Sequence, residues 1–92
     1  MKHTVKSIQA MRDKGEIITM LTAYDFPTAK KVNDSGIDMI LVGDSCAMVV
    51  HGHPNTLTAT MDMMVLHCAA VARACDRTMV IADMPFGSFQ YS

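Results

Sequence analysis

Three apolar runs of this chain each end in an aspartate: MLTAYD at residues 20–25, MILVGD at 39–44 and MVIAD at 79–83. In parallel α/β sheets, ligands bind at the carboxyl ends of the strands, which is where these aspartates would lie. A carboxylate at that edge loses hydration unless a partner compensates it, and a metal ion is one such partner. The pattern therefore predicts part of an active-site rim.

Asp44 and Asp83 follow the second and third runs. Neighbouring parallel strands lie about 4.8 Å apart, so the two carboxylates would repel unless one is protonated or a cation bridges them. Mg²⁺ is the usual cation where one or two carboxylates, water and an anionic substrate supply the ligands. Both aspartates could instead cap the loops or helices that follow, and spacing alone leaves the two interpretations open.

Other polar side chains surround these acids. Ser45 could hold a substrate carboxylate through its hydroxyl and backbone N–H, but no glycine pattern of a nucleophile elbow surrounds it. His51 and His53 could be metal ligands, yet no third His, Cys or carboxylate follows nearby, which favours loop structure. We expect His67 on the polar surface of its helix.

The elements that would position these residues alternate along the chain. We expect a helix over 4–14 that Thr4 caps, with Val5, Ile8 and Met11 on one face. We also expect strands over 17–23, 37–43 and 78–82, a helix capped by Asp25 with Pro27 in its first turn, and a helix beginning at Thr60. Because the strand runs do not alternate in polarity, they predict strands buried on both faces. The segment 44–60 is longer than most strand–helix connections, which predicts a functional loop.

This order, a helix followed by β-α-β-α-β, favours parallel strands with right-handed crossovers. The last helix has apolar residues at helical spacing, which predicts that one face is buried: Met61, Met64, Val65, Cys68, Ala69, Ala72 and Cys75. Three strands alone would leave both sheet edges open. We therefore expect residues 1–92 to form an incomplete α/β domain.

Composition excludes several classes of function. The formal net charge is −1 without a basic cluster, which argues against nucleic-acid and anionic-membrane partners. No run reaches the roughly 18 apolar residues of a transmembrane helix. The three cysteines lack zinc-ligand spacing, and their odd number favours a reduced, cytoplasmic protein.

Several blocks together resemble one enzyme family. They are MLTAYD at 20–25, LVGDS at 41–45, GH at 52–53, TL at 56–57, His67, AVAR at 70–73 and ADMPFGS at 82–88. The set is similar to ketopantoate hydroxymethyltransferase and runs in register from about Val5 to Ser88. Each block alone is a weak signal, and their combination is specific.

The resemblance implies the N-terminal portion of a (βα)₈ TIM barrel of the phosphoenolpyruvate/pyruvate type. An extra helix would cover the bottom of the barrel, and the full-length family would form a decamer. The implied reaction transfers a hydroxymethyl group from 5,10-methylenetetrahydrofolate to 3-methyl-2-oxobutanoate and yields 2-dehydropantoate, in pantothenate biosynthesis. The partners would be this 2-oxo acid and the folate.

The resemblance also implies site residues. Asp44 and Asp83 would bind Mg²⁺ and substrate, Ser45 would contact the keto acid, and Tyr24 would line the pocket. The family's further metal-site glutamate, substrate lysine and catalytic glutamate base come from later strands, beyond Ser92. We therefore expect no catalytic base among these 92 residues and no activity from them alone.

The chain departs from the family pattern at two places. Cys46-Ala47 replaces a hydrophobic residue and glycine, and Ala47 would be strained if its position required a positive φ. Thr58 stands where proline is common. Two alternatives remain: another Mg²⁺-dependent 2-oxo-acid lyase or mutase of the same barrel group, or a non-enzymatic remnant that pairs through its open strand edges.

Overall fold

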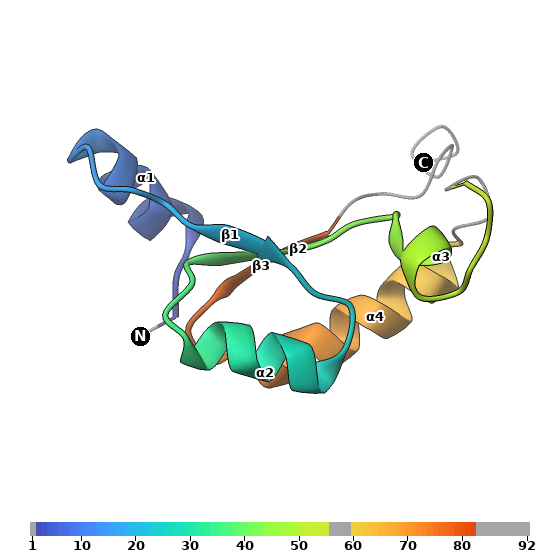
Figure 1. Cartoon of the computed structure of the whole chain (residues 1–92). Coiled ribbons are helices and arrows are strands. Elements are labelled where there is room, and N and C mark those ends of the chain that lie inside the picture. Colours follow the sequence, from blue (N-terminus) through green and yellow to red (C-terminus); the bar gives the residue numbers. More distant parts are fainter. Residues whose placement is uncertain (1, 56–59, 83–92) are drawn as a thin grey trace.

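The computed structural model describes residues 2–55 and 60–82. Its elements, in chain order, are α1 (Val5–Asp13), β1 (Met20–Thr22), α2 (Phe26–Asp34), β2 (Met39–Val42), α3 (Cys46–Val49), α4 (Met61–Ala74) and β3 (Met79–Ala82) (Figure 1). The predicted order of a helix followed by β-α-β-α-β is confirmed. The strands are shorter than predicted, and α3 occupies part of the segment predicted as loop.

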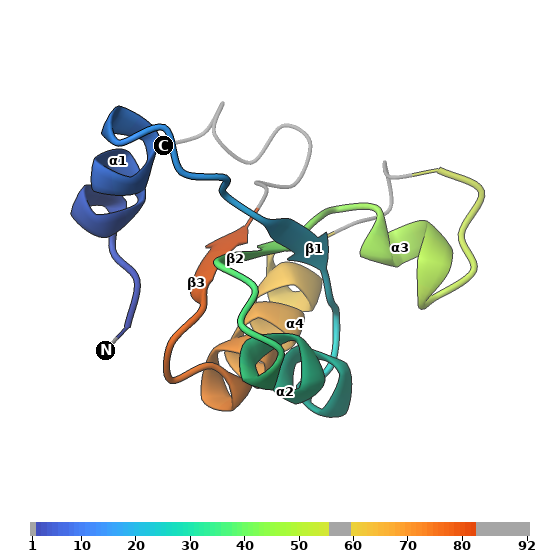
Figure 2. The same ribbon diagram turned by 60° about the vertical axis from the view of Figure 1, so that its left-hand side comes forward.

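The three strands form one parallel sheet in the order β1-β2-β3. In its register, Leu21 lies beside Ile40, and Ile40 lies beside Val80. Helices α2 and α4 lie side by side on one face of this sheet (Figures 1 and 2). The described part of the chain is thus an α/β arrangement of one parallel sheet and one layer of helices.

The core lies between the sheet and these two helices. Ile40 and Val42 from β2 and Val71 from α4 have no exposed surface. The cluster also includes Ala23, Ala29, Val32, Cys46, Met64, Ala74 and Cys75. Full burial of one aliphatic side chain contributes roughly 1.5–3 kcal/mol, so this layer is the main source of stability in the described fold.

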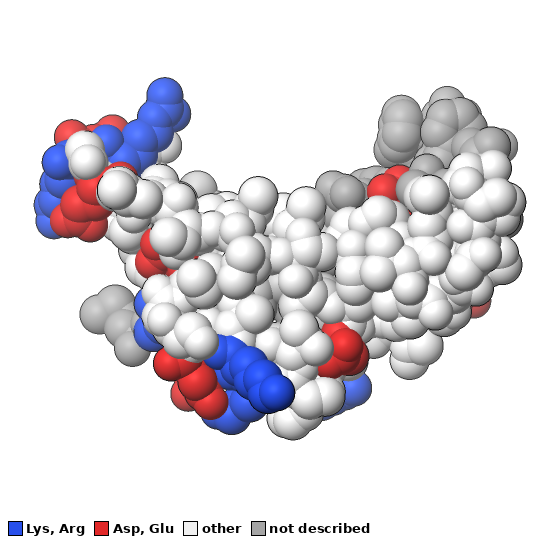
Figure 3. Space-filling view, viewed as in Figure 1, with Lys and Arg blue, Asp and Glu red and all other residues white. Residues whose placement is uncertain are grey.

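The second face of the sheet is open. Met20 and Leu21 on β1 are 52% and 50% exposed, and along β2 the fully buried Ile40 and Val42 alternate with half-buried Met39 and Leu41. Figure 3 shows that charged side chains gather over α1 and α2 and leave the surface beside the sheet uncharged. The prediction of strands buried on both faces is wrong for the described residues, because helices cover only one face.

Helix α1 lies beyond the amino ends of the strands (Figure 1). It begins with a capping box: Thr4 Oγ1 accepts a hydrogen bond from the Ser7 backbone N–H at 3.2 Å, and the Thr4 N–H donates to Ser7 Oγ at 2.8 Å. The predicted cap is confirmed. No residue of α1 is fully buried: Val5 is 74% exposed, whereas Ile8 and Met11 are half-buried, so the predicted apolar face is only partly packed.

The buried face of α4 differs from the predicted one. Met64, Val71 and Ala74 are buried, whereas Val65 is 58% exposed. Apolar residues occur on nearly every side of this helix, and Leu66 is also exposed. Periodicity therefore identified the helix, but it could not determine which side faces the sheet. No helix within residues 2–55 and 60–82 has the length and apolar character needed to cross a membrane.

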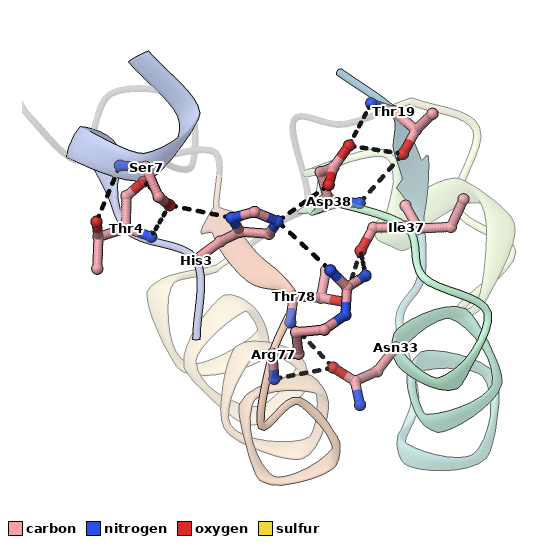
Figure 4. Close-up of polar contacts among 9 residues, drawn as sticks. All are labelled: His3, Thr4, Ser7, Thr19, Asn33, Ile37, Asp38, Arg77 and Thr78. Atoms are coloured by element: carbon pink, nitrogen blue, oxygen red, sulfur yellow. Dashed lines mark hydrogen bonds and ion pairs between the residues drawn. The ribbon is translucent and has the colours of Figure 1, made fainter. Parts of the chain in front are cut away.

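A polar network joins the chain segments at the amino ends of the strands (Figure 4). Asp38 Oδ2 accepts hydrogen bonds from the Thr19 backbone N–H at 3.0 Å and from the Thr19 hydroxyl at 3.1 Å. Asp38 Oδ1 lies 3.0 Å from His3 Nε2. The segment before α1 is thereby tied to the entrances of β1 and β2.

The same network continues to the entrance of β3. The Arg77 guanidinium donates to the Ile37 carbonyl at 2.6 Å, and Asn33 Oδ1 accepts from the backbone N–H groups of Arg77 and Thr78 at 3.1 and 3.0 Å (Figure 4). Every buried polar side-chain atom among the described residues has a hydrogen-bond partner. These contacts hold the amino ends of the strands in place. The candidate site residues lie at the opposite, carboxyl ends.

Candidate active site

The carboxyl ends of β1 and β2 bring Tyr24 and Ser45 together. The Ala23 N–H donates to the Leu41 carbonyl at 3.3 Å, which keeps the chain after β1 alongside β2. Tyr24 Oη then lies 2.7 Å from Ser45 Oγ, and both residues are half-buried. The structure thus places these two candidate site residues side by side, and their role toward a substrate stays a prediction.

Ser45 is held by the short helix α3. It occupies the N-cap position, but its hydroxyl makes no capping hydrogen bond and contacts Tyr24 instead. The Cys46 N–H donates to the Gly43 carbonyl at 3.1 Å, and the Ala47 N–H donates to the Asp44 carbonyl at 3.1 Å. These turns fix the backbone from which Asp44 and Ser45 project.

The Cys46-Ala47 departure introduces no backbone strain. Both residues are fully buried, and no non-glycine residue in the described ranges has a positive φ. Cys46 Sγ lies 3.8 Å from Met64 Sδ, which packs α3 against α4. Burial, together with the nearby Asp44 charge, raises the pKa of the Cys46 thiol, so this cysteine is a poor nucleophile.

Asp44 is half-buried at the end of β2. Carboxylate oxygens are ligands that a hard cation such as Mg²⁺ prefers. Asp83, the other predicted ligand, lies outside the described residues. In the part that the structure describes, no three metal-binding side chains converge. The predicted Mg²⁺ site therefore stays a prediction.

Asp25 has a different role from Asp44. It is the N-cap of α2, and its Oδ1 accepts a hydrogen bond from the Thr28 N–H at 2.8 Å. The backbone and side chain of Thr28 lower the pKa of this carboxyl, and the His67 ring contributes to the same shift. Pro27 lies in the first turn of the helix, as predicted. Asp25, the aspartate that follows the first strand, therefore stabilises a helix.

His67 is not a simple surface residue. It is half-buried, its Nδ1 lies 2.7 Å from the Tyr24 carbonyl oxygen, and its Nε2 lies 2.9 Å from His51 Nε2. The prediction failed because His51 and His67 are 16 residues apart and meet only through α3. His53 stacks beside His51 with ring centroids 6.5 Å apart. The spacing of His51 and His53 in the sequence gave no sign that His51 would contact His67.

Comparison with known proteins identifies the family. A family model described as Ketopantoate hydroxymethyltransferase matches residues 2–92. The chain is 57% identical over 90% of its length to a 3-methyl-2-oxobutanoate hydroxymethyltransferase of Rhodopirellula baltica, covering 31% of that protein. It is 53% identical over 99% of its length to the enzyme of that name from Staphylothermus marinus, covering 33% of it.

A plant protein is similar as well. The chain is 49% identical over 97% of its length to a protein of Oryza sativa named 3-methyl-2-oxobutanoate hydroxymethyltransferase 1, mitochondrial, and covers 24% of it. The chain thus spans a third or less of the length of these relatives. The matches include the strand ends that carry Tyr24, Asp44 and Ser45. The chain belongs to the ketopantoate hydroxymethyltransferase family.

Proposed function

We propose that this chain supplies the metal- and substrate-binding part of an enzyme that transfers a hydroxymethyl group from 5,10-methylenetetrahydrofolate to 3-methyl-2-oxobutanoate. The product would be 2-dehydropantoate. The observation that supports this most directly is the contact between Tyr24 and Ser45, the residue that follows Asp44 in the chain. Family membership supports the type of reaction.

Asp44 and Asp83 are the residues that we propose to hold Mg²⁺. When bound, the ion would stabilise the negative charge that develops on the keto oxygen as the C3 proton of the substrate is removed. The negative charge of Asp44 also favours the approach of a cation to this edge.

Tyr24 and Ser45 would orient the keto acid. Each hydroxyl has one hydrogen, and at 2.7 Å one of them donates to the other. One hydrogen then remains for a substrate oxygen, and the mutual contact restricts where it can point. The pair therefore suits a carboxylate or keto oxygen placed beside Asp44, since a positioned donor binds such an oxygen at little entropic cost.

The complete reaction needs more of the barrel than these residues form. A (βα)₈ barrel has about 250 residues, and the chain spans about a third of the first relatives. We propose that the 92 residues bind without turnover, and that the full-length protein is a homo-oligomer. The free cysteines Cys46, Cys68 and Cys75 support a reducing compartment such as the cytoplasm.

Titration of the chain with 3-methyl-2-oxobutanoate, followed calorimetrically with and without Mg²⁺, tests this proposal. We expect binding that requires Mg²⁺ and that weakens at least about tenfold in Asp44→Asn, since loss of a charged ligand group exceeds 1.4 kcal/mol. Asp62→Asn, an exposed acid in the first turn of α4, is the matched control. Binding that is indifferent to both Mg²⁺ and Asp44→Asn would contradict the proposal.

Assay of the same chain with the keto acid, Mg²⁺ and 5,10-methylenetetrahydrofolate tests the second part. We expect no 2-dehydropantoate. Formation of this product would show that the 92 residues, alone or associated, contain a complete catalytic site.

A further inference from the structure

Two imidazole nitrogens converge at the edge of the site without a role in the proposed reaction. His51 follows α3, and His67 lies in the middle of α4. Their Nε2 atoms are 2.9 Å apart, their ring planes meet at 74°, and the ring centroids lie 5.1 Å apart. His51 is exposed, so small solutes can reach the pair.

The contact of His67 with the backbone determines which of its nitrogens carries hydrogen. The Tyr24 carbonyl oxygen can only accept a hydrogen bond, so His67 Nδ1, at 2.7 Å, must be the donor. In the neutral ring, Nε2 then presents an unprotonated lone pair to His51. Histidines that bind metals have this arrangement, in which the second ring N–H is donated to a carbonyl or carboxylate.

The separation of the two nitrogens matches that of neighbouring ligands on one metal ion. Metal–imidazole bonds are about 2.0–2.1 Å long. Two such ligands at a right angle, as in octahedral coordination, lie about 2.9 Å apart, and at a tetrahedral angle about 3.4 Å apart. The observed 2.9 Å agrees with the octahedral pair, and a movement of about half an ångström would allow the tetrahedral one.

We propose that His51 and His67 form a two-histidine site for a transition-metal ion of the Co²⁺, Ni²⁺, Cu²⁺ and Zn²⁺ group. Imidazole is a preferred ligand of these ions, and water would complete the coordination on the exposed side. The Asp25 carboxylate is close enough to interact electrostatically with His67, which adds a favourable negative charge. The proposed Mg²⁺ site at Asp44 is separate from this one, because its ligands are hard carboxylate oxygens.

A bound ion would connect three parts of the active-site rim. It would join the segment after α3 to α4, and His67 would transmit this restraint to the Tyr24 backbone through the 2.7 Å hydrogen bond. The hydroxyl of the same tyrosine contacts Ser45. The ion would therefore restrain the chain after β1 and the chain after β2, where the proposed substrate site lies.

The alternative is a plain hydrogen bond, in which His51 Nε2–H donates to His67. Calorimetric titration of the untagged 92-residue chain with NiCl₂ and ZnCl₂ distinguishes the two. We expect one ion per chain, with affinity reduced at least about tenfold in His51→Gln and in His67→Gln, because even loss of an outer-shell partner costs 10–100-fold. His53→Gln, the neighbouring histidine, is the matched control and should change affinity less than about twofold.

Imidazole ¹⁵N chemical shifts of the unsubstituted chain provide a readout that does not depend on the variants folding. We expect both Nε2 resonances to shift on addition of Zn²⁺, while Nδ1 of His67 keeps its hydrogen. Absence of one-site binding would overturn the proposal, as would equal losses in all three histidine variants. A loss confined to Asp44→Asn would also overturn it, since the ion would then occupy the strand edge.

Discussion

The hydroxyl groups of Tyr24 and Ser45 lie 2.7 Å apart, although 21 residues separate them in the chain. Each residue follows its strand at the carboxyl edge, and the parallel pairing of β1 with β2 brings the two ends together. The Ser45 hydroxyl makes no capping hydrogen bond to α3 and contacts Tyr24 at this edge.

The coupling between these hydroxyls can be measured with a double-mutant cycle. We expect Tyr24→Phe and Ser45→Ala each to lower the free energy of unfolding, and their coupling energy to be about 0.5–1.5 kcal/mol, the usual worth of one hydrogen bond. Urea unfolding of the four proteins gives this value. A coupling energy of zero would show that the hydroxyls do not interact in solution.

Asp25 should stabilise α2 as its N-cap. Replacement by alanine removes the acceptor of the Thr28 N–H and should cost about 1 kcal/mol in the free energy of unfolding. Asp25→Ser, which keeps a capping oxygen, is the matched control and should cost much less. Equal losses in the two variants would mean that the charge of Asp25, rather than the cap, provides the stability.

The amino-side network should give the fold a characteristic acid sensitivity. Burial acts to raise the pKa of Asp38, but the hydrogen bonds from Thr19 and His3 outweigh it and hold the pKa below the ordinary value of 3.8. A carboxyl with a lowered folded-state pKa stabilises the fold above its unfolded pKa, and this stability disappears as pH falls through the folded pKa.

We therefore expect Asp38→Asn to lower the free energy of unfolding by about 1–3 kcal/mol at neutral pH, because it removes a charged hydrogen-bond acceptor. The loss should become progressively smaller below about pH 4. Urea unfolding at several pH values measures this difference. Asp34→Asn is the control, because its exposed ion pair with Lys30 should contribute less than about 1 kcal/mol. A cost for Asp38→Asn that stays constant down to pH 2 would contradict the assignment.

Sequence features that depend on neighbouring residues were predicted well. The caps at Thr4 and Asp25 use side chains that act within one turn of the backbone, so their positions could be derived directly. The order of strands and helices followed from the apolar runs between them. Parallel strands place consecutive carboxyl ends at one edge, but the direct contact of Tyr24 with Ser45 was not predicted.

Features that depend on tertiary packing were missed. The pairing of His51 with His67 needs the turn of α3, and that turn has too few residues to produce a periodic signal. The orientation of α4 was not determined, because apolar residues such as Leu66 lie on its exposed side too. Asp83, the second predicted metal ligand, lies outside the described residues, so the full ligand set stays a prediction.

The one-sided cover of the sheet predicts opposite outcomes for two aliphatic residues that pair across neighbouring strands. Leu21 and Ile40 are register partners, but Ile40 is fully buried and Leu21 is 50% exposed. We expect Ile40→Ala to lower the free energy of unfolding by about 2–5 kcal/mol, because it leaves a cavity under α2 and α4. Leu21→Ala should cost well under half as much, since much of its surface is already in water. Similar costs in urea unfolding would show that the second sheet face is covered in solution, for example by another copy of the chain, and a concentration-dependent midpoint would identify that cover as association.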